Sequence, residues 1–118
     1  MTTKKIREQI LESFLENLYG ISDKEYQKRV WVQGSGPEVD DYDETATDLL
    51  HEGEGILEAY KSFGIKITQY KKIKNFLSEF KKFSDDHDLP EEFIDTPEWA
   101  RIMDMAKEVL KAFDYKKN

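Results

Sequence analysis

Carboxylates crowd into one stretch of this chain, and they are the side chains that most clearly suggest a chemical role. Five of the seven residues that follow Pro37 are acidic: Glu38, Asp40, Asp41, Asp43 and Glu44. From residue 30 to residue 60 there are nine acidic residues and no Lys or Arg. Subtracting these nine from the 25 acids of the chain leaves 16 against 18 bases, so this stretch carries the whole negative excess of a net charge of −7.

A cation is the first ligand that such acids suggest. Asp41, Asp43 and Thr45 fit the first three ligand positions of an EF-hand calcium loop, but Ala46 falls where the turn of that loop needs Gly. Residues 43–46 also have the composition of a helix start, where the helix dipole favours acids. A helix N-terminus is therefore the preferred interpretation.

A second metal hypothesis uses one helical face. Glu44, Asp48 and His51 are spaced i, i+4 and i+7, and they would share one side of a helix. Di-metal helix bundles need a Glu-x-x-His on two helices and two further Glu residues, and no second half of such a site is present in the sequence. We expect no metal and a solvent-facing His51, while divalent-cation binding stays an alternative function.

The residue types needed for covalent catalysis or phosphate binding are missing or misplaced. The chain has no Cys, neither His has an evident Ser partner, and Gly34-x-Gly36 is followed by Pro and acids instead of Lys or Ser/Thr. We therefore expect a protein that is not an enzyme and has no cofactor, in which the two glycines serve a tight turn.

Recognition of a basic protein is the remaining use for these acids. Unpaired carboxylates speed the encounter with a basic surface, and a buried aromatic side chain can anchor the complex. The other interpretation, in which the acids only solvate a loop, stays equally open. Under the first hypothesis the partner-binding residues are Trp31, Glu38, Asp40, Asp41, Tyr42, Asp43, Glu44 and Asp48. The same negative field would oppose binding to nucleic acid or to an anionic membrane.

Apolar residues at helical spacing predict the elements that position these side chains. The expected helices span residues 4–19, 23–32, 44–63, from 68 onward and from 97 onward. Their caps and breaks are assigned to Gly20, Ser22, Asp43, Gly53, Gly55, Gly64, Thr68 and Thr96. Residues 29–32 are β-prone, so a short strand is the alternative there, and residues 84–95 are expected to form a polar loop. The chain is thus predicted to be a single all-α domain, residues 1–118, folded as a compact irregular bundle of about five helices.

The predicted fourth helix is basic. Six lysines accompany one acid, Glu79; they are Lys66, Lys71, Lys72, Lys74, Lys81 and Lys82. A basic helix can follow a phosphate backbone. Since the helix has no Arg and the acidic stretch would oppose binding, a solvated lysine face over an apolar core stripe is the preferred interpretation.

Two segments carry a resemblance to known proteins: "RVWVQGSGPEVDDYDET" (29–45) and "PEEFIDTPEWARIMDMAKEVLKAF" (90–113). With them the chain resembles a group of small, acidic, mostly uncharacterised bacterial proteins. In size, acidity and lack of Cys it is also similar in type to the immunity proteins of contact-dependent growth inhibition and related toxin systems. This resemblance implies a toxin domain, often a basic nuclease, as the partner, and neutralisation by occlusion. It assigns no contact residue.

The expected cellular location follows from two features that the sequence does not show, a signal peptide and a membrane-spanning segment. The first twenty residues mix charges with apolar residues instead of forming the continuous apolar run of a signal peptide. No segment approaches the 18 or so apolar residues of a membrane span. We expect a cytoplasmic, monomeric or dimeric protein. Self-association of a structural or regulatory helical protein through exposed aromatic side chains is a further alternative.

Overall fold

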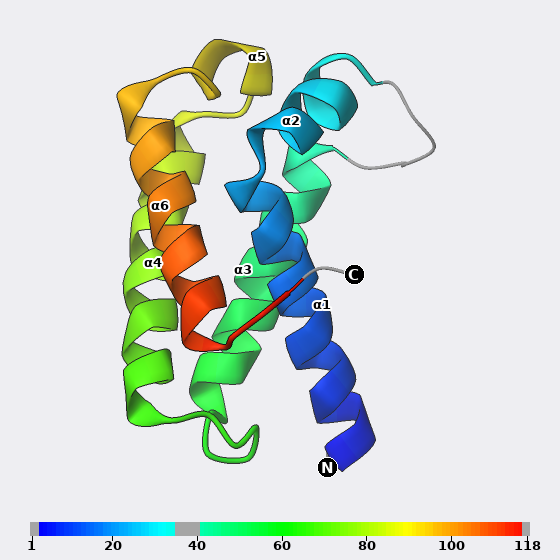
Figure 1. Ribbon diagram of the computed structural model, residues 1–118, viewed down its shortest axis with the longest axis vertical. Coiled ribbons are helices and arrows are strands. Elements are labelled where there is room, and N and C mark those ends of the chain that lie inside the picture. Colours follow the sequence, from blue (N-terminus) through cyan, green and yellow to red (C-terminus); the bar gives the residue numbers. More distant parts are fainter. Residues whose placement is uncertain (1–2, 35–40, 117–118) are drawn as a thin grey trace.

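The computed structural model describes residues 3–34 and 41–116, and every regular element in those ranges is helical (Figure 1). The elements are α1 (Lys4–Ser22), α2 (Lys24–Tyr26), the π-helical segment η1 (Gln27–Val32), α3 (Tyr42–Glu58), α4 (Ile67–Asp86), α5 (Pro90–Phe93) and α6 (Pro97–Ala112). The prediction of an all-α bundle is confirmed.

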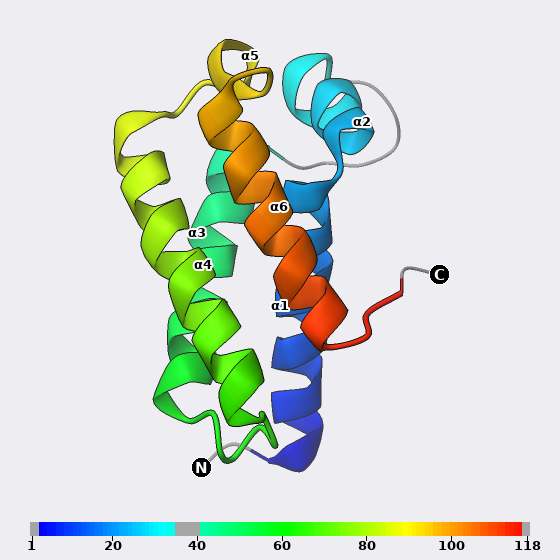
Figure 2. The ribbon, with the colours of Figure 1, turned by 60° about the vertical axis from the view of Figure 1, so that its left-hand side comes forward.

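Four long helices form the body of the bundle. α1 packs against α3 and α6, and α4 packs against the same two helices from the other side. Figure 2 shows α6 in front between α4 and α1, with α3 behind them. The outer faces of α3 and α6 therefore lie on opposite sides of the molecule, and this separation matters for the two candidate sites.

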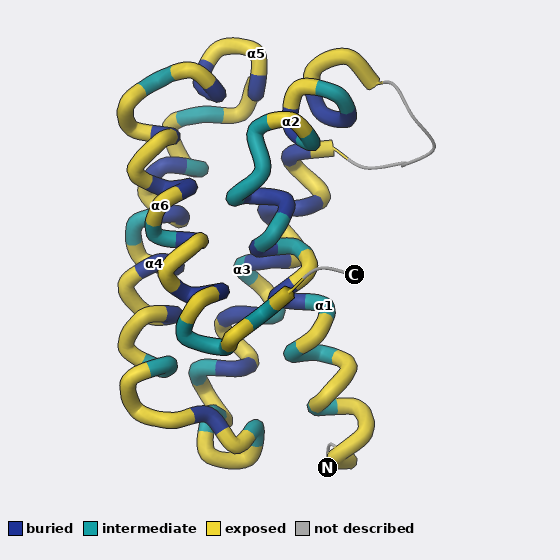
Figure 3. The backbone as a smooth tube through the Cα atoms, viewed as in Figure 1, coloured by how far each residue is buried: buried dark blue, intermediate teal, exposed yellow. Residues whose placement is uncertain are grey.

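An aromatic core holds these helices together. The largest side chains with almost no exposed surface are Phe14, Phe76, Phe80, Phe93 and Trp99. They come from α1, α4, α5 and α6, and buried positions line the inner side of each long helix (Figure 3). Burial of such rings is the main driving force for the fold, since each removes a large apolar surface from water. α5 packs against η1 and closes one end of the core.

The end of α1 differs from the prediction. Gly20 lies inside the helix, which continues to Ser22, and the glycines with positive φ among the described residues are Gly34 and Gly64. The chain turns at Asp23, whose extended backbone ends α1 and whose side chain accepts a hydrogen bond from the Tyr26 N–H at 3.3 Å. Asp23 is thus the N-cap of α2, one residue after Ser22, where the capping box predicts the cap.

The segment from Gln27 to Val32 is neither an α-helix nor a strand. It is π-helical, and the Gln33 N–H donates to the Lys28 carbonyl at 2.9 Å, one residue further back than in an α-helix. The wider turn brings Gln27, Val30 and Trp31 to the buried side. The helix predicted over residues 23–32 is therefore present, with a π-helical second part, and the alternative of a short strand at residues 29–32 is wrong.

α3 is one uninterrupted helix, so the break predicted at Gly53 and Gly55 is wrong. Gly53 packs so closely against α4 and α1 that a Cβ atom would lie 2.5 Å from Leu77 Cδ1 and 3.1 Å from Phe14 Cε1. This glycine permits close helix packing and does not break the helix. Gly64 has the predicted positive φ, 71°, but α3 already ends at Glu58 with Ala59 as its C-cap, so Gly64 lies in the turn that follows and does not end the helix.

The boundaries of α4 and α6 test three further expectations. α4 begins at Ile67, and the Lys66 N–H donates to Gln69 Oε1 at 2.8 Å, so Thr68 already lies in the first turn and does not cap the helix. The predicted loop over 84–95 is shorter, because α4 continues to Asp86 and α5 forms within it. Thr96 caps α6 as predicted, since its Oγ1 accepts a hydrogen bond from the Trp99 N–H at 3.2 Å.

Candidate functional site

The acidic stretch folds into the first turns of α3. Asp41 is the N-cap, and its Oδ1 accepts a hydrogen bond from the Glu44 N–H at 2.7 Å. The cap was predicted at Asp43, which instead lies in the first turn beside Glu44. Carboxylates here are stabilised by the positive end of the helix dipole. The preferred sequence interpretation, a helix N-terminus, is therefore confirmed, and a coiled calcium loop over these residues is not formed.

Four of the predicted partner-binding acids lie together in solvent. Asp41, Asp43, Glu44 and Asp48 are all exposed, and we call these four residues the α3 acidic surface. Two other predicted members, Glu38 and Asp40, lie outside the described residues. The ion pairs between described side chains join Lys24 to Asp95, Lys72 to Glu108 and Arg101 to Glu79, and none of these includes the α3 acidic surface.

The two predicted aromatic anchors are not on the surface, which corrects their proposed role. Trp31 is 9% exposed and Tyr42 is 3% exposed. Their ring centroids are 5.5 Å apart in an edge-to-face arrangement, and both rings also contact Trp99. Their position beside the acidic stretch had suggested that they anchor a partner, but both rings instead fill the core between η1, α3 and α6.

The buried hydroxyl of Tyr42 has a single polar partner in the described structure. Its Oη lies 2.8 Å from Ser84 Oγ of α4. Burial raises the pKa of Tyr42 to about 12, against the opposing effect of the Ser84 hydrogen bond and with an addition from the Asp43 carboxylate. Tyr42 therefore stays neutral at physiological pH and joins the first turn of α3 to α4.

Neither metal hypothesis gains support from the geometry. Within residues 3–34 and 41–116, no three His, Asp or Glu side chains come close enough to hold a metal ion. Glu44, Asp48 and His51 do share the outer side of α3, but they do not converge. His87 ends α4, where its ring stacks on Phe83 at 4.1 Å and its Nδ1 lies 2.9 Å from the Phe83 carbonyl. Both histidines are accounted for as structural or solvated residues.

The lysines of α4 form the solvated face that the sequence predicts. All six, from Lys66 to Lys82, are exposed, whereas Ile73, Phe76, Leu77, Phe80 and Phe83 of the same helix are buried. Lys72 Nζ lies 3.7 Å from Glu108 Oε2 of α6, an exposed pair of small energetic weight.

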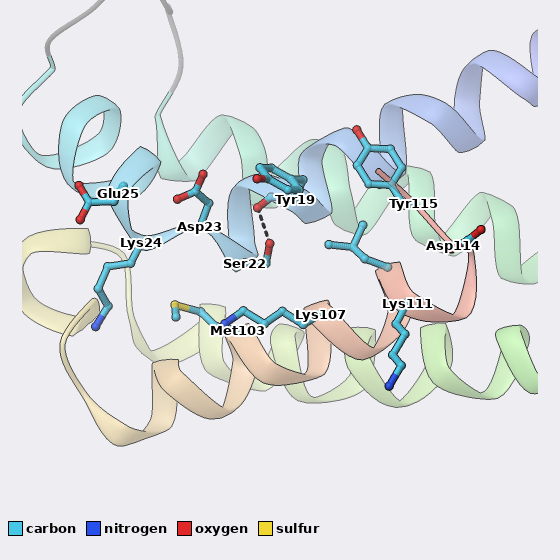
Figure 4. Close-up of a pocket in the computed structure, with 11 residues that line it drawn as sticks. Tyr19, Ser22, Asp23, Lys24, Glu25, Met103, Lys107, Lys111, Asp114 and Tyr115 are labelled. Atoms are coloured by element: carbon cyan, nitrogen blue, oxygen red, sulfur yellow. Dashed lines mark hydrogen bonds between the residues drawn. The ribbon is translucent and has the colours of Figure 1, made fainter. Parts of the chain in front are cut away.

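A groove on the opposite side of the molecule was not predicted. It lies between the end of α1, α2 and α6 and has a volume of about 650 Å³ (Figure 4). Met103 and Leu110 of α6 line it, and Tyr19 of α1 faces them. The Tyr19 and Tyr115 ring centroids are 6.2 Å apart. Burial raises the pKa of Tyr115, with smaller contributions from Glu16, Glu12 and Tyr19, so its phenol is neutral. The sequence holds no local cue for this groove, because its walls lie far apart along the chain.

The last alternative function is self-association through exposed aromatic side chains. No Phe, Tyr or Trp among the described residues is exposed. The large exposed apolar side chains there are aliphatic: Ile6, Val32, Ile67 and Leu89. In the described part of the chain, no helix combines the length and apolar character needed to cross a membrane.

Comparison of the chain with family models, with curated proteins and with solved structures gives no match. The candidate function therefore rests on the chemistry of the α3 acidic surface.

Proposed function

We propose that this protein is a non-catalytic binding protein that docks the α3 acidic surface onto a basic surface of a partner protein. The single observation that supports this proposal most is the exposure of Asp41, Asp43, Glu44 and Asp48 on a helix without any Lys or Arg. Such a field speeds encounter with a basic partner and repels acidic ones. The anionic backbone of nucleic acid and an anionic membrane are disfavoured as direct partners for the same reason.

Because Trp31 and Tyr42 are buried, they cannot form the apolar contact with the partner that the sequence suggested. An anchor has to come from a side chain that water reaches, and Val32, next to Trp31, is 40% exposed. Trp31 packs against Tyr42 in the first turn of α3, and Val32 is the exposed apolar residue next to it in the chain. Val32 therefore takes the place of the aromatic rings as the apolar contact at the edge of the interface.

The biological form of the proposal is an immunity protein of a bacterial toxin system. It would act in the cytoplasm, with occlusion of a basic toxin domain as its mechanism. This form rests on the type resemblance of the sequence, whereas the basic character of the partner rests on the carboxylates of α3. No metal, cofactor or catalytic group takes part.

The test is capture from an extract of the source cells with tagged protein, followed by quantitative mass spectrometry. The variant Asp43→Lys, Glu44→Lys, Asp48→Lys reverses the surface and leaves the Asp41 cap in place. The matched control is Glu8→Lys, Glu12→Lys, Glu16→Lys, which makes the same change of net charge at exposed positions on α1. We expect a basic protein to be captured by wild type and by the α1 control and to be lost from the α3 variant. Equal recovery with all three proteins would contradict the proposal.

A further inference from the structure

The large exposed aliphatic side chains of the described residues lie at the two ends of the bundle. In Figure 1 the start of α1 and the turn that leads into α4 lie at the bottom of the long axis, whereas α5 and η1 lie at the top. Ile6 of α1 and Ile67, the first residue of α4, are 46% and 52% exposed. At the other end Leu89, the residue before α5, is 46% exposed, and the exposed Val32 ends η1, which packs against α5. Each end of the molecule therefore presents two aliphatic side chains to water.

The end that carries Ile6 and Ile67 is positively charged. Residues 3–8 and 58–67, which we call the basic end, include two acids, Glu8 and Glu58, against five bases. The bases are Lys4, Lys5, Arg7, Lys61 and Lys66. All four lysines are exposed, and none of them forms an ion pair with another described side chain. Residues from both segments, among them Lys4 and Phe63, line one small pocket, so the start of α1 and the turn form a continuous surface.

The end that carries Leu89 is negatively charged. Residues 83–96, which we call the acidic end, include six acids and no Lys or Arg, and all six acids are exposed. They are Asp85, Asp86, Asp88, Glu91, Glu92 and Asp95. Asp95 pairs with Lys24, and the other five have no ion-pair partner in the described part of the chain. Lys81 and Lys82 precede this segment by one turn of α4 and offset only part of its charge.

This distribution of charge favours one mode of contact between two copies of the chain. A contact of either end with its own kind would bring like charges together, which is unfavourable, whereas the basic end and the acidic end attract each other. A contact between unlike ends is heterologous and leaves one end of each kind open, so it extends into a chain of molecules and does not close as a dimer. The two shorter dimensions of the molecule, 29 and 24 Å, limit the buried area to about 700 Å² per copy, slightly less than in a standard interface. The association should therefore be weak.

We propose that this protein associates head to tail with further copies of itself, with the basic end of one copy docked on the acidic end of the next. Ile67 and Leu89 provide the apolar centre of the contact, and the surrounding lysines and carboxylates direct its orientation. This association goes beyond the proposed function, because no residue of the α3 acidic surface belongs to either end. Each of the two binding activities can therefore be lost while the other is kept.

Sedimentation velocity of the full chain tests whether it associates. We expect the weight-average sedimentation coefficient to rise steadily between about 10 µM and about 1 mM protein in about 0.02 M salt, and to return to the monomer value in about 0.5 M salt. A sedimentation coefficient that does not change with concentration at low salt would overturn the proposal, and so would a dimer that grows no further.

Two variants with one altered end each test the head-to-tail geometry. The basic-end variant is Lys61→Gln, Lys66→Gln, Ile67→Gln, and the acidic-end variant is Leu89→Gln, Glu91→Gln, Glu92→Gln; all six positions are exposed. Each variant alone should stay monomeric. An equimolar mixture should form a 1:1 dimer and no longer species, because the intact acidic end of one variant meets the intact basic end of the other. A mixture that stays monomeric would overturn the proposal.

A charge-matched control separates the ends from a general effect of net charge. Lys74→Gln, Lys107→Gln removes the same two positive charges as the basic-end variant, at exposed positions along α4 and α6. This control should associate like wild type. Equal loss of association in the control and in the basic-end variant would show that net charge, and not the basic end, governs the association.

Discussion

Trp99 Nε1 donates a hydrogen bond to Gln27 Oε1 at 2.8 Å across the buried junction of η1 and α6. The amide nitrogen of the same Gln27 donates to the Gly20 carbonyl at 3.0 Å and to the Ile21 carbonyl at 2.9 Å. Gln27 has no exposed surface. One side chain thus bonds two carbonyls in the last turn of α1 and the indole of α6, and it ties η1 to both helices.

Replacement of Gln27 by Met should destabilise the protein strongly. The thioether keeps the approximate shape but leaves the buried Trp99 indole N–H without its acceptor and removes one donor from each of the Gly20 and Ile21 carbonyls, which costs about 3 kcal/mol of unfolding free energy. Urea denaturation followed by Trp fluorescence measures this loss. In a double-mutant cycle with Trp99→Phe, the two effects should not add, because they share one hydrogen bond. Additive effects would contradict the assigned coupling.

Two glycines of α3 should respond to the same substitution with opposite signs. Gly53→Ala places a methyl group against Leu77 and Phe14, and the overpacking costs about 1 to 2 kcal/mol beyond any gain in helix propensity. A methyl group added at Gly55 would meet no neighbouring atom within 4 Å, so Gly55→Ala should stabilise by about 0.5 to 1 kcal/mol. Thermal unfolding of both variants checks the pair. Stabilisation by Gly53→Ala would show that α3 and α4 pack less closely than described.

Asp114 occupies a left-handed conformation that Gly would adopt without strain. Its φ is 51°, its N–H donates to the Lys111 carbonyl, and the Tyr115 N–H donates to the Leu110 carbonyl, as in a Schellman motif. Asp114→Gly should raise the unfolding free energy by about 1 kcal/mol. Asp114→Asn is the control, because it removes the charge and keeps a residue tolerant of positive φ. If both variants gain equally, the charge and not the backbone limits stability here.

Alkaline pH should unfold the protein partly through Tyr42. Its pKa is raised to about 12 by burial, whereas the phenol of the unfolded chain ionises near pH 10. Below pH 10 the phenol is neutral in both the folded and the unfolded state, and the free energy of unfolding does not depend on its ionisation. As the pH rises from about 10 to 12, the phenol ionises more readily in the unfolded chain, and the free energy of unfolding falls by up to about 2 kcal/mol. Tyr42→Phe should show a smaller loss of stability over that interval in urea titrations. An identical loss would mean that other groups carry the alkaline transition.

The sequence predicts the long helices and the Thr96 cap, whereas the caps of α3 and α4 lie at Asp41 and Lys66, two residues before the predicted ones. Periodic apolar positions placed the core face of α4 and α6, and Gly64 and Thr96 act through neighbours within a few residues. Gly20 and Gly53 were misassigned because their roles depend on contacts made only after folding, with Gln27 and with Leu77. An isolated glycine in a helix indicates a break unless the neighbouring helices are known.

The candidate sites divide in the same way. The exposed position of Asp43, Glu44 and Asp48 could be predicted from local sequence alone. Acidic side chains near a helix N-terminus are stabilised by the helix dipole while they stay in solvent. Trp31 and Tyr42 were misplaced because burial depends on α6 and α4, which follow much later in the chain. The groove was missed because its lining residues, such as Tyr19 and Lys107, come from helices that are far apart in the sequence.

The association rate of the captured partner, measured as a function of salt, tests the account most directly. Wild type and the Glu8, Glu12, Glu16 control should associate rapidly and slow down as ionic strength rises from about 0.02 M to about 0.5 M. The Asp43, Glu44, Asp48 reversal should associate about tenfold or more slowly at low salt and lose most of the salt dependence. Equal rates and equal salt slopes for all three proteins would contradict the claim that the α3 acidic surface recognises a basic partner.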